Sequence, residues 1–92
     1  MGCVKFIIKG KVQRVFYRKY VSNALKKAGY IGYIKNLNNG DVEVVLKTEA
    51  NQDISQVLNI LNQGSPKSEV KSIQMQECDS EVKFSNSFEV RY

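Results

Sequence analysis

The stretch "YIGYIKNLNNGDVEVVLK" (residues 30–47) decides the fold, because it holds two strand patterns around one tight turn. Residues 30–36 and 42–47 are rich in the β-branched and aromatic side chains that favour strands. Asn39-Gly40, between them, is a strong signal for a tight hairpin. The stretch therefore predicts an antiparallel hairpin in the middle of the chain.

Apolar residues at helical spacing lie on both sides of this hairpin. They are Val21, Ala24, Leu25 and Ala28 before it, and Ile54, Val57, Leu58 and Leu61 after it. Spacing of i, i+3, i+4 and i+7 predicts one apolar face on each of two helices. Gly29 follows the first helix, where a left-handed helix end favours glycine, and Gly64 with Pro66 ends the second.

Three further segments complete the pattern. Residues 3–9 alternate between apolar and polar, residues 70–78 form a fourth strand, and residues 88–92 form a short fifth. The order β-α-β-β-α-β plus a final strand is typical of a ferredoxin-like α/β sandwich, an α+β fold. We predict that residues 1–92 form a single domain, with two helices packed on one face of an antiparallel sheet of four to five strands.

The composition restricts the chemistry. Fourteen Lys and Arg against nine Asp and Glu give a net charge of +5, which suits an anionic partner or simply a soluble surface. The chain has no histidine, which excludes Ser-His and Cys-His nucleophile pairs and every histidine-based metal site. Any chemistry must therefore use Arg, Lys, Asn, carboxylates and the backbone. No apolar run approaches the roughly 20 residues that span a bilayer, and no signal-peptide pattern opens the chain, so we expect a cytoplasmic protein without membrane contact.

The two cysteines are too far apart in sequence for a CxxC motif. In the predicted fold the first and fourth strands are antiparallel neighbours, so Cys3 and Cys78 lie at adjoining ends on the solvent-facing side of the sheet. A cross-strand disulfide there is geometrically feasible if the Cα atoms are roughly 4.4–6.8 Å apart. In a reducing cytoplasm we expect two free thiols instead.

The segment "GKVQRVFYRK" (residues 10–19) joins the first strand to the first helix. The N-terminus of a helix has unpaired N–H groups and the positive end of its dipole, so a tight turn before it can hold an anion. Arg18, just inside the helix, can bind two phosphate oxygens in a planar, bidentate way. The alternative is a solvated basic turn whose Val12, Val15 and Phe16 fill the core.

Two motifs in this chain resemble the signatures of the acylphosphatase family. The first, G-x-V-Q-G-V-x-F-R, appears here as Gly10, Val12, Gln13, Val15, Tyr17 and Arg18, with Tyr17 at the position written F. The second, G-[WFY]-[VI]-x-N-x-x-[DN]-G-x-V-E, is matched by Gly32, Tyr33, Ile34, Asn36, Asn39, Gly40, Val42 and Glu43. The segments "GSPKSEV" (64–70) and "FEVRY" (88–92) also resemble family landmarks, so the likeness covers nearly the whole chain.

The resemblance implies an enzyme that hydrolyses acyl phosphates to a carboxylate and inorganic phosphate, so we expect no cofactor, no metal and no covalent intermediate. By position, Arg18 is the phosphate-binding arginine and Asn36 the asparagine that positions the water. The expected phosphate-binding residues, mainly through backbone amides, are Gln13, Arg14, Val15, Phe16, Tyr17 and Arg18. Taken alone, Asn36 before a hairpin is also a common turn residue.

Two positions depart from the family pattern. Arg14 stands where the family usually has glycine, and Val21 stands where relatives commonly have threonine. If the backbone at Arg14 needs a positive φ, a side chain there costs on the order of 1–2 kcal/mol. Otherwise the local backbone suits any residue, and Arg14 adds a second cation beside the substrate. Val21 removes a hydroxyl that would help to aim the loop.

Two alternatives to an active enzyme follow. One is a relative that binds phosphate but is catalytically impaired by Arg14. The other, less favoured, is a nucleic-acid-binding module, since RNA-binding domains of this fold stack bases on aromatics of the third strand. Here that strand, residues 42–47, has no aromatic side chain and carries Glu43 on the expected open face. We expect a monomer, since no large apolar patch is evident on that face.

Overall fold

The computed structural model describes residues 2–48, 54–78 and 84–91 of the chain. Within these residues the elements are β1 (Gly2–Lys11), α1 (Tyr17–Lys27), β2 (Gly32–Asn36), β3 (Val42–Thr48), α2 (Ser55–Gln63), β4 (Glu69–Glu77) and β5 (Phe88–Arg91). Each predicted strand and helix is present, with ends that shift by a few residues. β2 begins at Gly32, because Tyr30 and Ile31 lead into it from the end of α1, and β1 continues past residue 9 to Lys11.

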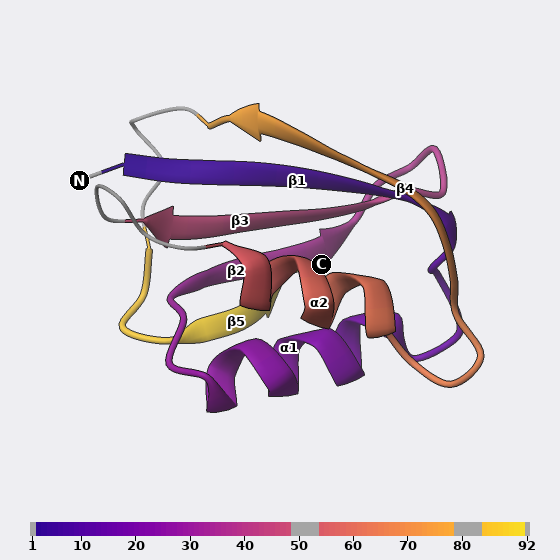
Figure 1. The fold of residues 1–92 in the computed structure, drawn as a ribbon, viewed down its shortest axis with the longest axis horizontal. Coiled ribbons are helices and arrows are strands. Elements are labelled where there is room, and N and C mark those ends of the chain that lie inside the picture. Colours follow the sequence, from indigo (N-terminus) through magenta and orange to yellow (C-terminus); the bar gives the residue numbers. More distant parts are fainter. Residues whose placement is uncertain (1, 49–53, 79–83, 92) are drawn as a thin grey trace.

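The strands form one sheet in the order β4-β1-β3-β2-β5 (Figure 1). β1 pairs antiparallel with both β3 and β4, and β2 pairs antiparallel with β3. β5 runs parallel to β2, with Gly32 opposite Phe88. The βαββαβ prediction is confirmed, and the four strands of that core are antiparallel as expected. The fifth strand makes the sheet mixed, because it lies at the opposite edge from β4 and runs in the direction of β2.

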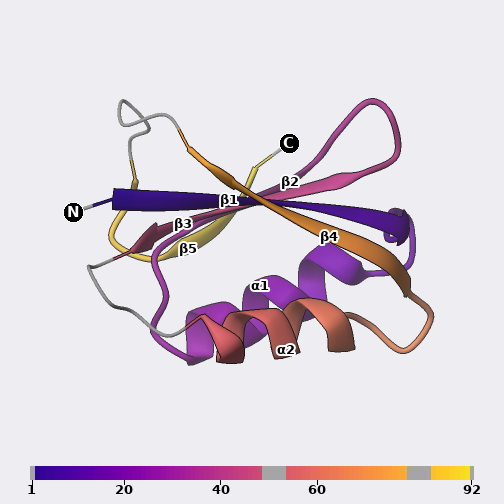
Figure 2. The ribbon, with the colours of Figure 1, turned by 45° about the horizontal axis from the view of Figure 1, so that its top comes forward.

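Both helices cover the same face of the sheet (Figures 1 and 2). Burying their apolar stripes against the inward-facing strand positions produces one continuous core. It includes Phe6, Ile8, Val21, Leu25, Ile34, Val44, Leu46, Val57, Leu61 and Phe88. Gly29 follows α1 with φ 89°, as its position predicts, and its amide bonds to the Lys26 carbonyl at 3.1 Å. No helix in the described ranges is long and apolar enough to cross a membrane.

The other face of the sheet carries a polar network around Glu43. This carboxylate is 8% exposed, lies 3.5 Å from the Lys5 ammonium and accepts a hydrogen bond from the Tyr33 hydroxyl at 3.4 Å. The Arg91 guanidinium lies 4.0 Å above the centre of the Tyr33 ring. Burial and the Glu43 charge raise the pKa of Tyr33, while Arg91 acts in the opposite direction. The Tyr33 ring on this face is therefore covered by Arg91, which disfavours base stacking on it.

Cys3 and Cys78 are joined by a disulfide between β1 and β4, with their Cα atoms 5.6 Å apart. The pairing of Val4 with Glu77 places the two cysteines opposite one another at the next position along the ladder. The predicted geometry is confirmed, and the expectation of two free thiols is wrong for this structure. Because β4 is the edge strand of the sheet, the bond fixes its end to the interior strand β1.

Candidate active site

Two connections lie at the same end of the sheet (Figures 1 and 2). One is the β1–α1 loop (residues 12–16), and the other is the β2–β3 hairpin turn (residues 37–41). The hairpin turn is closed by Leu37 and Asp41, whose amide and carbonyl bond at 2.8 Å. The Asn39 side chain accepts the Asp41 amide at 3.0 Å, and the Gly40 amide donates to the Leu37 carbonyl at 3.2 Å. Gly40 has φ 97°, whereas Asn39 is not left-handed, so the predicted hairpin is confirmed and the positive φ of its turn falls on Gly40.

Asn36 is the last residue of β2, directly before this turn. Side chains alternate along a strand, so Asn36 projects to the same face as the fully buried Ile34, towards the helix layer. Its Oδ1 atom is buried and accepts no hydrogen bond from the described residues. A buried carbonyl oxygen without a donor is costly, by about 1–3 kcal/mol, unless a water or ligand supplies one. This observation favours a functional role over a simple turn residue.

The chain leaves β1 through an irregularity in its pairing with β4 between Lys9 and Gly10. Gly10 has φ 134°, and a Cβ atom there would overlap the carbonyl of Glu69. Only glycine therefore allows β1 to approach β4 so closely before it turns towards α1. The loop that follows buries Val12 and Val15, whereas Phe16 is 67% exposed. The alternative in which all three side chains fill the core is thus wrong for Phe16.

The β1–α1 loop contains two left-handed residues. Arg14 has φ 61°, and Phe16 has φ 62° at the N-cap of α1. A positive φ at Arg14 explains why the family usually has glycine there, since a Cβ atom disfavours this conformation by about 1–2 kcal/mol. The alternative, that the local backbone suits any residue, is wrong.

Side-chain hydrogen bonds and an ion pair connect the loop and the strand before it to other elements. Gln13 donates through Nε2 to the carbonyls of Leu37 and Asp41, both at 2.8 Å. The Ser65 hydroxyl donates to the Val15 carbonyl from the segment after α2. Lys9 pairs with the Asp41 carboxylate at 3.3 Å. Gln13 therefore ties the loop to the hairpin turn that follows Asn36, and its side-chain amide donates to two carbonyls of that turn.

Several amides of this region have no backbone acceptor. Within the described ranges, residues 13–16 donate no backbone–backbone hydrogen bond. The first amides of a helix also lack acceptors within it, and the first of α1 that bonds is Tyr20, to the Phe16 carbonyl at 3.1 Å. α1 has no acidic side chain in its first turn and no side-chain cap. The loop and helix start therefore present donors and a positive dipole end to an anion.

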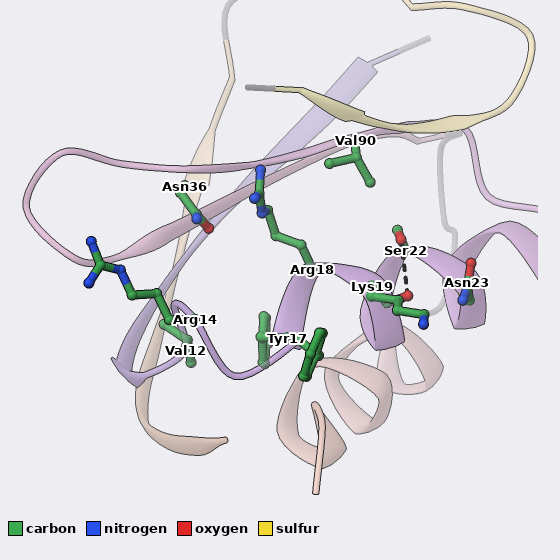
Figure 3. A pocket seen from close by; sticks show the side chains of 10 residues that line it. Val12, Arg14, Tyr17, Arg18, Lys19, Ser22, Asn23, Asn36 and Val90 are labelled. Atoms are coloured by element: carbon green, nitrogen blue, oxygen red, sulfur yellow. Dashed lines mark hydrogen bonds between the residues drawn. The ribbon is translucent and has the colours of Figure 1, made fainter. Parts of the chain in front are cut away.

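Arg18 lies in the first turn of α1 and reaches towards Asn36 (Figure 3). Its Nη1 donates to the carbonyl of Arg91 on β5 at 3.3 Å, so the last strand holds the guanidinium beside the loop. The neighbouring Tyr17 ring is 1% exposed, and its hydroxyl donates to the Leu61 carbonyl at 2.7 Å. Burial raises the pKa of Tyr17, so this hydroxyl stays protonated and anchors the helix start instead of acting as a base.

A pocket of about 530 Å³ lies over this region (Figure 3). Its lining residues are Val12, Arg14, Phe16, Tyr17, Arg18, Lys19, Ser22, Asn23, Asn36 and Val90. The pocket brings together most of the predicted site residues, including both predicted catalytic side chains. Gln13 and Val15 do not line it, because their side chains anchor the loop and fill the core.

Sequence reasoning missed the far part of the pocket, made by Lys19, Ser22, Asn23 and Val90. Helix periodicity could have found Ser22, which lies four positions after Arg18 and so shares its helix face. Val90 required the pairing of β5 with β2, which no local pattern encodes. No carboxylate is among the lining residues, so the pocket is a basic, half-open site suited to an anion.

Comparison with known proteins agrees with this description. The acylphosphatase family model matches residues 4–90. An acylphosphatase of Dehalococcoides mccartyi is 42% identical over 76 residues, which cover 80% of this chain and 81% of the relative. The crystal structure of the acylphosphatase from Bacillus subtilis matches with a TM-score of 0.83 at 29% identity over 100% of both chains.

An acylphosphatase structure from Coxiella burnetii matches with a TM-score of 0.76 at 30% identity, over 98% of this chain and 92% of that one. Taken with the fold and the basic pocket, these likenesses place the chain among the hydrolases built on a ferredoxin-like sandwich. More narrowly, the chain belongs to the acylphosphatase family.

Proposed function

We propose that the pocket over the β1–α1 loop binds the phosphate of an acyl phosphate and directs a water molecule at its phosphorus atom. The observation that carries this proposal is the convergence of three features on one pocket. They are the amides of residues 13–16, which donate no backbone–backbone hydrogen bond within the described ranges, the Arg18 guanidinium, and the buried Asn36 Oδ1 that has no donor among the described residues.

The phosphate would sit against the amides of residues 13–18, at the positive end of α1. Arg18 would bind two of its oxygens and stabilise the charge that spreads over them as the bond to the leaving group lengthens. Preorganised donors of this kind typically contribute a factor of about 10²–10³ each to kcat. The contact of Arg18 with the Arg91 carbonyl would keep the guanidinium in place before substrate arrives.

A turn of the Asn36 side-chain amide would bring the buried Oδ1 to the pocket that this residue lines. There Oδ1 would accept a hydrogen bond from the attacking water, which orients the oxygen lone pair towards phosphorus. The water oxygen forms a bond to phosphorus as the bond between phosphorus and the acyl oxygen breaks. The acyl group leaves as a carboxylate, and the proton of the water passes to a phosphate oxygen. A carboxylate is a good leaving group, so this scheme needs no general acid and routes no step through a metal.

A second candidate is a relative that binds phosphate without turnover. The left-handed conformation of Arg14 favours it, since a side chain at a position of φ 61° stores strain next to the amides. Phosphate binding is expected of both candidates, so turnover decides between them.

The test is hydrolysis of benzoyl phosphate in the presence of a chelator, by wild type, Arg18→Ala and Asn36→Ala. We expect fast wild-type turnover and a loss of kcat of at least about 10²-fold in each variant. Lys27→Ala, at the last turn of α1, and Asn38→Ala, in the exposed hairpin turn, are matched controls that should retain activity. Folded wild-type protein that binds phosphate without turnover would establish the second candidate instead.

Two further points belong to the proposal. The monomeric state stays a prediction of the sequence. The cytoplasmic location stays a prediction of the sequence, and the Cys3–Cys78 disulfide speaks against a strongly reducing compartment.

A further inference from the structure

The pocket continues well beyond the residues assigned to the phosphate. From Arg18 it extends along α1 to Lys19, Ser22 and Asn23, with Val90 of β5 as its other wall (Figure 3). Its volume of about 530 Å³ is in the range of sites that hold a whole small molecule, and a phosphate group fills only a fraction of that space. The remainder is available to the acyl group.

The direction of attack decides where the acyl group lies. In phosphoryl transfer the attacking and leaving oxygens lie roughly in line through phosphorus. If Asn36 holds the water, the acyl group leaves on the opposite side of the phosphate. Figure 3 shows Lys19 and Asn23 on the other side of Arg18 from Asn36. The acyl chain therefore points along α1, towards these two side chains.

The end of the pocket near Lys19 and Asn23 carries a positive charge and several hydrogen-bond donors. Lys19 and Asn23 are exposed and four residues apart, so they lie next to one another on the helix surface. Among the residues that the structure describes, neither forms an ion pair with a carboxylate or a side-chain hydrogen bond. Ser22 is different, because it is 8% exposed and its hydroxyl already donates to the Lys19 carbonyl at 3.1 Å.

We propose that Lys19, assisted by Asn23, selects acyl phosphates whose acyl group carries its own carboxylate. This inference rests on the proposed function and adds the substrate class that the pocket favours. A carboxylate at the far end of a short acyl chain would meet the Lys19 ammonium and the Asn23 amide, whereas a methyl group there would leave both in water. Arg14 and Arg18 attract the phosphate of either substrate, so they do not contribute to this selectivity.

The expected preference is modest because Lys19 is exposed. Ion pairs in such positions change an equilibrium by about 2- to 5-fold, and salt weakens them. We therefore expect wild type to prefer succinyl phosphate over butyryl phosphate by a factor of this size. The two substrates have acyl chains of equal length and differ at the chain end, where one has a carboxylate and the other a methyl group.

The experiment compares the ratio of kcat/KM for succinyl phosphate to kcat/KM for butyryl phosphate in wild type, Lys19→Gln and Lys19→Glu. We expect the ratio to fall about 2- to 5-fold in Lys19→Gln, to fall further in Lys19→Glu, and to approach the Lys19→Gln value in wild type at 0.5 M salt. Lys26→Gln makes the same charge change at the last turn of α1 and should leave the ratio as in wild type.

A ratio that is the same in wild type, Lys19→Gln and Lys19→Glu would overturn the inference and leave the proposed function intact, because both substrates would still be hydrolysed. An equal fall in Lys26→Gln would also overturn it, since net charge and not the pocket would then set the preference. Failure of folded wild type to hydrolyse either substrate would remove the proposed function, and this inference with it.

Discussion

Replacing Arg14 with glycine separates the two effects of this side chain, one on the backbone and one on charge. The left-handed conformation at φ 61° disfavours a residue with a Cβ atom by about 1–2 kcal/mol. Glycine removes this penalty, but it also gives the unfolded chain more freedom, which costs about 0.5–1 kcal/mol. The free energy of unfolding of Arg14→Gly should therefore rise by about 0–1.5 kcal/mol, and Arg14→Ala should not show this gain.

The charge effect should appear in KM. Arg14 is exposed at the pocket, so its interaction with a phosphate is screened by water and salt. Two unit charges about 6 Å apart in water interact by about 0.7 kcal/mol. Screening by 0.15 M salt roughly halves this energy, and the second charge of a phosphate dianion doubles it again, so the interaction stays at about 0.7 kcal/mol. Loss of about 0.7 kcal/mol corresponds to a KM about 3-fold higher. We expect this rise in both Arg14→Gly and Arg14→Ala, with kcat within about 2-fold of wild type.

Urea unfolding and benzoyl phosphate kinetics on the three proteins test both numbers. If Arg14→Gly increased kcat by more than about 10-fold while Arg14→Ala did not, the wild-type loop would be distorted by Arg14. That result would refute the view that the amides are already arranged for phosphate. A rise in KM confined to Arg14→Gly would show that glycine loosens the loop and that charge is not the cause.

Three further perturbations have expected outcomes. Gln13→Ala removes two hydrogen bonds of 2.8 Å between the loop and the hairpin turn, so unfolding by urea should show a loss of about 1–3 kcal/mol, with reduced kcat. Tyr17→Phe should flatten the loss of stability at alkaline pH. Folded Tyr17 keeps its proton because its pKa is raised, whereas the unfolded chain releases it near the ordinary value of about 10. The contribution of the Tyr17 hydroxyl to the free energy of unfolding is therefore complete below about pH 10 and falls above it. Reduction of the Cys3–Cys78 disulfide, which spans 75 positions, should lower the free energy of unfolding by about 2–4 kcal/mol.

A specific result would contradict each of these three predictions. Unchanged kcat in a destabilised Gln13→Ala would show that the link between loop and hairpin turn does not position the site. Identical slopes of stability against pH above pH 10 in wild type and Tyr17→Phe would contradict a raised pKa for that hydroxyl. The double variant Cys3→Ser/Cys78→Ser controls for side reactions of the reductant. Thiol labelling that finds both cysteines free in protein purified without reductant would contradict the disulfide itself.

The parts of the fold that local sequence encodes were predictable. The hairpin follows from Asn39-Gly40 between strand-forming residues, and the end of α1 follows from Gly29, because each depends on the conformational freedom of one or two residues. The position of Arg18 in the first turn of α1 was also predictable, because it depends only on where the helix begins.

The features that sequence reasoning missed depend on contacts between distant segments. The parallel pairing of β5 with β2, and with it the contact of Arg18 with the Arg91 carbonyl, depends on how the chain crosses the sheet. The side chain of Gln13 has donors suited to phosphate and to carbonyls alike, and only the position of the hairpin turn decides between them. Phe16 is exposed and has a left-handed backbone conformation. Its apolar side chain gave no sign of either feature in the sequence.

Hydrolysis of benzoyl phosphate in ¹⁸O-labelled water tests the central claim most directly, because it shows which atom the water attacks. A phosphate held by the β1–α1 loop and Arg18, with water oriented by Asn36, predicts that the label enters inorganic phosphate and that benzoate stays unlabelled. Label in benzoate would mean that water attacks the carbonyl carbon, and the assigned roles of Arg18 and Asn36 would be wrong.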